Sequence, residues 1–211
     1  MSLKREKEAE MNPEHQENRT FRGMKRITFI ATVFLLTLLT GMLYRQLSQP
    51  VDGQPRSTLW VSSTSFTSGG EIPSQYTCEG ADVSPQLGWQ AAPAGTKSLA
   101  VVMHDPDAPA DFTHWVVWNI APGARELAVG ASGRGGMPPG AREGSNDFGH
   151  PGYGGPCPPP GKPHRYNFRV YALDILVNLP AGATRRELEA AMSGHLIAVG
   201  QLVGIYRRAG Q

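Results

Sequence analysis

The stretch DFGHPGYGGPCPPPGKPHRYNFRVYALD, residues 147–174, decides the fold. Its first half, up to Pro163, is dense in glycine and proline and cannot form a regular strand, because proline lacks a backbone donor and glycine weakens strands. From His164 onward apolar and polar side chains alternate, which is typical of a strand with one face on the core. The stretch therefore predicts a stiff loop that leads directly into a buried strand, with His164 at the junction.

A second junction of the same kind lies upstream. The segment HDPDAP, residues 104–109, is acidic and contains proline, and the aromatic and β-branched run FTHWVVWNI, residues 112–120, follows it. The apolar run 98–103 that precedes both predicts a strand buried on both faces. Loops held by a rigid scaffold often carry binding groups, so we expect the two junctions to close on one small polar pocket.

These two blocks resemble the two signature blocks of the phosphatidylethanolamine-binding protein family, most closely its bacterial, Raf kinase inhibitor-like branch. A third stretch, residues 72–89, is similar to the same family, and the resemblance covers roughly residues 66–207. It implies a mainly β fold with antiparallel sheets of the Greek-key type and one or two short C-terminal helices. It also implies a small pocket for phosphate-like anions.

The candidate pocket residues combine anion donors with carboxylates. Histidine suits a phosphate or carboxylate through its N–H donors, Asp105 would orient an imidazole or hold a ligand amine, and the amides of Gly154 and Gly155 would form an anion nest. This combination suits a head group such as phosphoethanolamine. Tyr166 is either a hydroxyl donor or a core residue. The resemblance implies these ligand-binding residues: Asp105, Pro106, Asp107, His114, Gly155, Pro156, His164 and Tyr166.

Other polar residues near these junctions have structural interpretations. We expect Arg165 to form a salt bridge, and His104 to be a hydrogen-bonded histidine at a strand end. His150 and His195 stand alone in the sequence and are not assigned to the site. No metal or cofactor site is predicted.

Composition and the C-terminal pattern agree with a β-rich protein that ends in helices. The chain contains 25 Gly and 18 Pro, which favours a loop-rich β fold. Thr184 and Glu187 have the spacing of a capping box that opens a helix. Apolar residues recur at helical spacing within 195–203, which predicts a second helix, and residues 204–206 would end the domain as a strand.

The N-terminal region has a different character. Residues 1–26 are polar and charged, which predicts a disordered tail. Residues 27–44 are apolar and uncharged, and at the rise of a helix they would span about 27 Å, enough for a membrane anchor. Basic residues precede this run, so the tail would be cytoplasmic and the domain periplasmic or extracellular. Residues 45–64 would form a linker, and residues 65–211 the domain.

Two alternatives to the anchor remain at this point. A cleaved signal peptide would give a secreted domain, although no small-residue cleavage site follows the apolar run. A buried core helix is the other alternative. The two cysteines, Cys78 and Cys157, would form a disulfide if the domain faces an oxidising compartment, and would otherwise be separate thiols.

Charge and motifs narrow the function classes. The formal net charge is only +2, and basic residues concentrate in 1–26, so the remainder offers no basic face for nucleic acid. A hydrolase would need a nucleophile, yet neither the Gly-x-Ser-x-Gly nor the His-Glu-x-x-His motif occurs. An inhibitor of a protease or another protein partner is a further alternative. We therefore expect a membrane-anchored binding module and not an enzyme.

Overall fold

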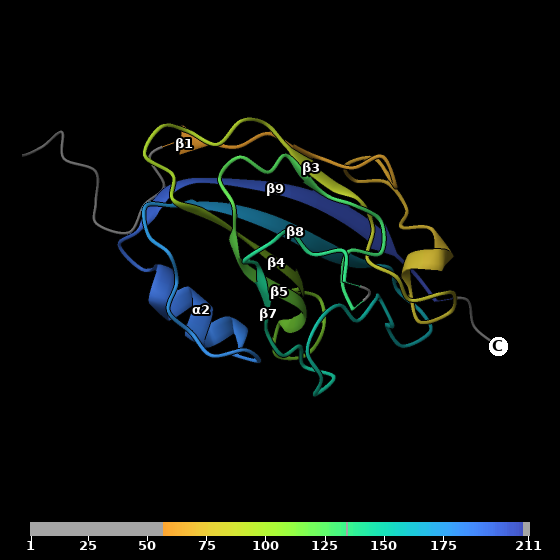
Figure 1. The fold of residues 1–211 in the computed structure, drawn as a ribbon. Helices are drawn as coiled ribbons and strands as arrows, with labels where there is room; N and C mark the ends of the chain where they lie inside the picture. Colours follow the sequence, from red (N-terminus) through yellow and green to blue (C-terminus); the bar gives the residue numbers. More distant parts are fainter. Residues whose placement is uncertain (1–56, 134, 209–211) are drawn as a thin grey trace, which may run out of the picture. The chain divides into compact units, whose positions relative to one another are not determined.

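The computed structural model describes residues 57–133 and 135–208. These residues form a six-stranded sheet, a three-stranded sheet and one α-helix (Figure 1), which confirms the mainly β prediction. The expected tail and anchor, 1–26 and 27–44, lie outside this part of the chain. Within 57–133 and 135–208, no helix has the length and apolar character needed to cross a bilayer.

The six-stranded sheet carries the long strands. Its order is β1-β9-β8-β4-β5-β7, and every neighbouring pair is antiparallel except β1 and β9, which are parallel. The strands are β1 (Ser57–Thr58), β4 (Ser98–Asp105), β5 (Phe112–Ile120), β7 (Arg142–Glu143), β8 (His164–Leu173) and β9 (Leu196–Tyr206). The strands predicted at 98–103, 114–120 and from His164 onward thus lie beside one another in the sheet.

The three-stranded sheet is short and antiparallel, with the order β2-β3-β6. Its strands are β2 (Val61–Ser62), β3 (Leu87–Trp89) and β6 (Glu126–Leu127), and a 3₁₀ turn, η1 (Ser74–Tyr76), lies between β2 and β3. Strands therefore occur from Ser57 onward, within the segment 45–64 that was assigned to the linker.

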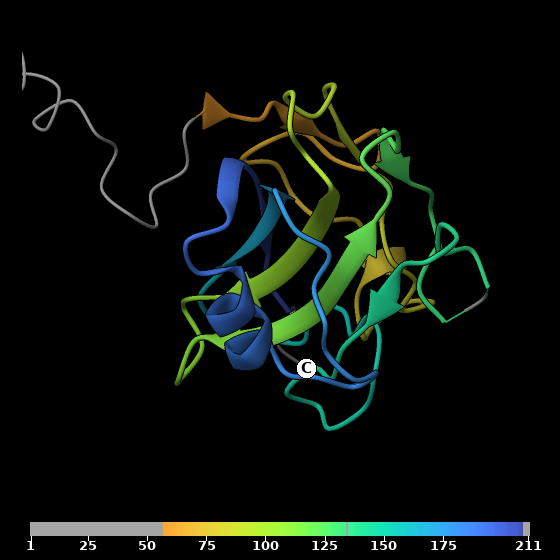
Figure 2. The same cartoon turned by 60° about the vertical axis from the view of Figure 1, so that its left-hand side comes forward.

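The central strand β4 packs on both faces, which gives the domain its layers. Leu99, Val101 and Met103 pack in the core that contains the small sheet. Ala100 and Val102 pack in a second core with α2 (Arg185–Met192). Figures 1 and 2 show α2 on one side of the large sheet and β3 on the other. Burial on both sides explains why this strand reads as a continuous apolar run.

The helix predicted from the capping box is present, but the second helix is not. Thr184 caps α2, and the Glu187 side chain accepts from the Thr184 backbone, so both halves of the capping box form. Residues 196–203 instead belong to β9, so the prediction of a helix over 195–203 was wrong.

Two glycines of β9 explain this outcome. A Cβ at Gly200 would lie 2.3 Å from the Leu59 carbonyl oxygen, and one at Gly204 would lie 2.5 Å from Ile72 Cγ1. Both positions therefore require close approach of the backbone, which favours glycine in a packed strand. The residues between them alternate in burial, as a strand requires. The helical spacing of the apolar residues was coincidental.

Candidate functional site

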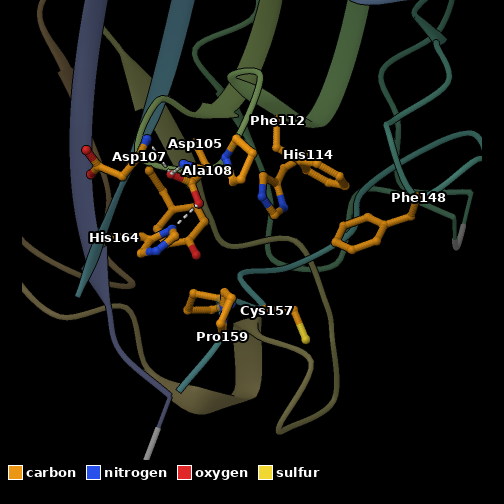
Figure 3. Close-up of a pocket in the computed structure, with 12 residues that line it drawn as sticks. Asp105, Asp107, Ala108, Phe112, His114, Phe148, Cys157, Pro159 and His164 are labelled. Carbon is orange, nitrogen blue, oxygen red and sulfur yellow. Dashed lines mark hydrogen bonds and ion pairs between the residues drawn. The ribbon is translucent and has the colours of Figure 1, made fainter. Parts of the chain in front are cut away.

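Three neighbouring strands bring the predicted site residues together at one end of the large sheet. Asp105, the last residue of β4, pairs with Phe112 at the start of β5, and His104 pairs with Asn167 near the start of β8. A cavity of about 320 Å³ opens at this end (Figure 3). Its lining residues are Asp105, Asp107, Ala108, Pro109, Phe112, His114, Phe148, Cys157, Pro158, Pro159, His164 and Tyr166.

Most of the sequence-predicted residues lie on the wall of this cavity. They are Asp105, Asp107, His114, His164 and Tyr166, whereas Pro106, Gly155 and Pro156 are not among the lining residues. Four lining residues were not predicted from the sequence: Phe112, Phe148, Pro158 and Pro159. Phe112 could have been found, because it lies two residues before His114 and so shares its face of the strand.

Asp105 acts inside the protein, as a fixed acceptor. Its Oδ2 accepts a 2.7 Å hydrogen bond from His164 Nδ1. Its Oδ1 accepts from the backbone amides of Asp107 and Ala108, at 2.8 and 3.1 Å. The residue is only 2% exposed, so its carboxylate positions His164 and is shielded from solvent.

His114 is fixed by the opposite side of the pocket. Its Nδ1 lies 2.7 Å from the Gly154 carbonyl oxygen, and since a carbonyl can only accept, Nδ1 carries the proton. The side chain is almost completely buried, and this burial lowers the pKa of His114, against the raising effect of the Gly154 carbonyl. At neutral pH His114 is therefore uncharged, with the proton on Nδ1.

Asp107 and Arg165 neutralise one another at the rim. The Arg165 guanidinium donates two hydrogen bonds to the Asp107 carboxylate, at 2.9 and 2.6 Å, and its backbone amide donates a third. These bonds lower the pKa of Asp107 to about 2. The expectation that Arg165 forms a salt bridge is confirmed, and neither group brings net charge to the cavity.

The expected anion nest does not form. The Gly155 amide donates to Asp82 Oδ1 at 2.7 Å, and the Gly154 amide donates to the His114 carbonyl at 3.0 Å. A Cβ at Gly155 would lie 2.4 Å from the Tyr76 carbonyl oxygen. These glycines therefore allow the loop to pack against residues 76–82, and the prediction that their amides face a ligand was wrong.

A disulfide holds this loop in place. Cys78 and Cys157 are bonded, with their Cα atoms 5.4 Å apart, and the Cys78 amide donates to the Pro156 carbonyl. Figure 3 shows Cys157 and Pro159 below His164 and His114 in that view. The crosslink thus fixes the wall of the cavity that the large sheet does not supply.

Aromatic rings surround His114. The centroids of Phe112, Tyr166 and Phe148 lie 5.1, 5.2 and 5.4 Å from that of His114. Phe112 and Phe148 are in edge contact at 4.7 Å, and Phe148 is 45% exposed. The cavity therefore combines an apolar aromatic corner with a few polar atoms, a mixture usual in small-molecule sites.

Tyr166 is both a core residue and a pocket residue. Its side chain is fully buried in the core that contains Phe168. Burial raises the pKa of Tyr166, and the nearby Asp105 carboxylate raises it further. The hydroxyl lies near the Asp105 carboxylate but has no partner at hydrogen-bond geometry among the described residues, so it can donate to a ligand.

The remaining histidines lie away from the cavity. His104 is buried and its Nδ1 contacts Asp111, as expected for a structural histidine. His195 Nδ1 lies 2.8 Å from Asp174. The ring of His150 stacks on that of Phe148, but His150 does not line the cavity. In residues 57–133 and 135–208, no group of three or more potential ligands is arranged for a metal ion.

The fold and the cavity define the class: a two-sheet β protein with a histidine-lined pocket at one end of the larger sheet. A family model described as phosphatidylethanolamine-binding protein matches residues 62–207. The chain therefore belongs to the phosphatidylethanolamine-binding protein family, as the sequence blocks suggested.

Relatives and solved structures support the same family membership. A UPF0098 protein of Aquifex aeolicus is 48% identical over 153 residues, which cover 70% of this chain and 88% of the relative. A UPF0098 protein of Methanothermobacter thermautotrophicus is 46% identical over 149 residues, which cover 70% of this chain and 98% of the relative. The structure of YbcL from Escherichia coli, described as a member of the mammalian family, has a TM-score of 0.68 at 36% identity, covering 71% of this chain and 98% of that one.

Proposed function

We propose that the pocket binds a small phosphate-like anion or a phosphoethanolamine-type head group, and that the protein is a binding module and not an enzyme. One observation carries this proposal. His114 on β5 and His164 on β8 line the same cavity, and each is held through Nδ1 by a different protein acceptor. Two imidazoles fixed in this way present their Nε2 atoms for one ligand.

The size and lining of the cavity support a small head group. At about 320 Å³ it lies at the lower end of the usual range for ligand sites. Polar atoms are few, and the aromatic corner of Phe112 and Phe148 offers ring faces that attract an ammonium group. A phosphate near the histidines with an amine near the rings would match this arrangement.

The lining residues supply no evident nucleophile, which favours binding over hydrolysis. Cys157 is oxidised in the disulfide, and both oxygens of Asp105 accept hydrogen bonds from the protein. No serine or lysine is among the residues that line the cavity. A hydrolase would have to use a water activated by a histidine.

We further propose that the domain faces the periplasm or the cell exterior, anchored through residues 27–44. The disulfide supports this location, because such bonds persist mainly in oxidising compartments. The apolar, uncharged character of residues 27–44 and the basic residues before them support the anchor and its orientation. Protease accessibility of the domain in intact cells and in spheroplasts tests the orientation.

The binding proposal is tested with the full chain and two ligands. Phosphoethanolamine and inorganic phosphate should raise the melting temperature, since a ligand at one hundred times its Kd stabilises by about 2.7 kcal/mol. The double change His114→Ala and His164→Ala should abolish the rise, whereas His195→Ala, outside the cavity, should retain it. Turnover of phosphoester or ester substrates, lost in the double variant, would instead indicate an enzyme.

A further inference from the structure

The hydrogen-bond partners of the two pocket histidines fix their tautomers. His114 Nδ1 faces the Gly154 carbonyl, and His164 Nδ1 faces the Asp105 carboxylate. Both partners only accept, so each Nδ1 must carry a hydrogen. In the neutral imidazole the remaining nitrogen, Nε2, then has a lone pair and no hydrogen. At neutral charge, both histidines therefore offer acceptors to the cavity, although an anion needs donors.

Several other donors near the cavity are already occupied. The amides of Asp107 and Ala108 donate to Asp105, and the amides of Gly154 and Gly155 donate to His114 and Asp82. The Arg165 guanidinium donates to Asp107. Among the described side chains of the wall, the Tyr166 hydroxyl is the donor that lacks a partner. A fully deprotonated anion near the two histidines would thus meet the lone pairs of their Nε2 atoms.

We propose, building on the anion-binding function above, that the pocket takes its anion together with a proton. Either the ligand brings an acidic O–H that donates to Nε2, as hydrogen phosphate does, or the imidazoles of His114 and His164 become protonated at Nε2. The pocket therefore selects protonated oxyanions over sulfate at neutral and alkaline pH. Sulfate has no hydrogen to donate in this range and binds only when the histidines are charged.

The charges around the histidines agree with this selection. Burial lowers the pKa of His114, while the carboxylates of Asp105 and Asp147 act in the opposite direction. Asp107 is paired with Arg165. At the far wall, beside Cys157, Arg208 is paired with Glu79, which also accepts from the Tyr206 hydroxyl. No lysine or arginine is among the described residues that line the cavity, and the buried Asp105 carboxylate would compensate an imidazolium.

Calorimetric titration of the full chain with inorganic phosphate and with sulfate, from pH 8 to pH 5.5, tests the proposal. Phosphate should bind throughout. Sulfate should be undetectable at pH 8 and should gain about tenfold in affinity per pH unit for each proton taken up. Repeating the titrations in buffers of different ionisation enthalpy counts these protons, and circular dichroism checks that the chain remains folded.

A variant and a control make the test specific. His114→Gln replaces the imidazole with an amide that donates without being charged, so sulfate binding should appear at pH 8 and depend less on pH. His195→Gln removes a histidine outside the cavity and should behave as the unchanged chain. Equal binding of sulfate and phosphate at pH 8 would overturn the selection and leave the anion site standing. Failure of both anions at every pH would overturn the proposed function itself.

Discussion

Two histidine–aspartate pairs lie at the end of β4, and they differ in their surroundings. His164 donates to Asp105 on the pocket side, and His104, the neighbour of Asp105 on β4, contacts Asp111. Successive residues of a strand point to opposite faces, so the pairs are separated by the sheet. In each pair Nδ1 faces a carboxylate, and the pairs differ in what surrounds Nε2.

The environment of Nε2 decides what each pair does. His164 lines the cavity, so its Nε2 is available to a ligand. The Nε2 of His104 is buried without a hydrogen-bond partner in the described part of the chain. Asp111 also binds Arg185 of α2 at 3.0 Å, so this second pair fastens the loop after β4 to the helix. A histidine–aspartate motif by itself therefore does not mark a binding site.

The largest effect is expected from the disulfide, which lies beside the pocket pair. The double change Cys78→Ser and Cys157→Ser should lower the free energy of unfolding by about 4 kcal/mol, because the bond closes a loop with a sequence separation of 79. It should also weaken phosphate binding, since Cys157 lines the cavity. Urea denaturation and calorimetry measure the two effects. An unchanged phosphate affinity would show that the loop keeps its position without the crosslink.

Removing the carboxylate of the pocket pair comes next. Asp105→Ala leaves the His164 Nδ1 and two backbone amides without their acceptor, so the free energy of unfolding should fall by about 3 kcal/mol. Ligand binding should be lost with it, because His164 is no longer oriented. Asp105→Asn keeps one acceptor oxygen and should lose less stability. Retention of full phosphate affinity by the Ala variant would contradict a positioning role.

Removing the carboxylate of the buried pair should separate stability from binding. Asp111→Ala leaves His104 with two unsatisfied ring nitrogens and breaks the contact with Arg185. The free energy of unfolding should fall by about 1–2 kcal/mol, while the phosphate Kd remains that of the unchanged chain. A changed Kd with an unchanged melting temperature would mean that the two pairs communicate across the sheet.

Acid should destabilise the fold through two buried histidines, His104 and His114. Burial lowers the pKa of His104 and of His114 below the ordinary value of 6.5. The unfolded chain therefore binds more protons, so this stability is present above pH 6.5 and is lost as the pH falls through the folded pKa values. Saturating phosphate should restore the contribution of His114 but not that of His104. Urea midpoints at two pH values, with and without phosphate, distinguish them.

The smallest effect is expected at the rim. Arg165→Ala breaks the salt bridge with Asp107, but the Arg165 side chain is 62% exposed, and exposed ion pairs contribute little to stability. The melting temperature should stay nearly unchanged at moderate salt, in contrast to Asp105→Ala. A loss comparable to that of Asp105→Ala would show that the rim pair holds the pocket together.

The sequence predicted the elements that alternate or pack on two faces. The alternation after His164 predicted β8, and the continuous apolar run 98–103 predicted β4, because each pattern reports burial directly. The pocket histidines were predictable because each follows a proline-containing loop at the start of a strand. Their convergence depended on strand order, which single-strand patterns do not contain.

The errors arose where backbone packing matters more than side-chain pattern. In β9, Gly200 lies against Leu59 and Gly204 lies against Ile72. The spacing of the apolar residues does not indicate these contacts. The amides of Gly154 and Gly155 were assigned to a ligand, whereas Asp82 and the His114 carbonyl accept from them. A loop sequence shows where amides are accessible but not which acceptor the fold brings to them.

The register of β9 has a practical consequence for handling the protein. Its first half pairs with Ser57 of β1, while its last residue, Tyr206, pairs with His164 at the cavity. The two ends of the folded domain therefore emerge at opposite ends of the large sheet. A fluorophore or an immobilisation tag joined ahead of Ser57 would start far from the cavity mouth. The same label placed after Arg208 would start next to Cys157 and would obstruct the titrations described above.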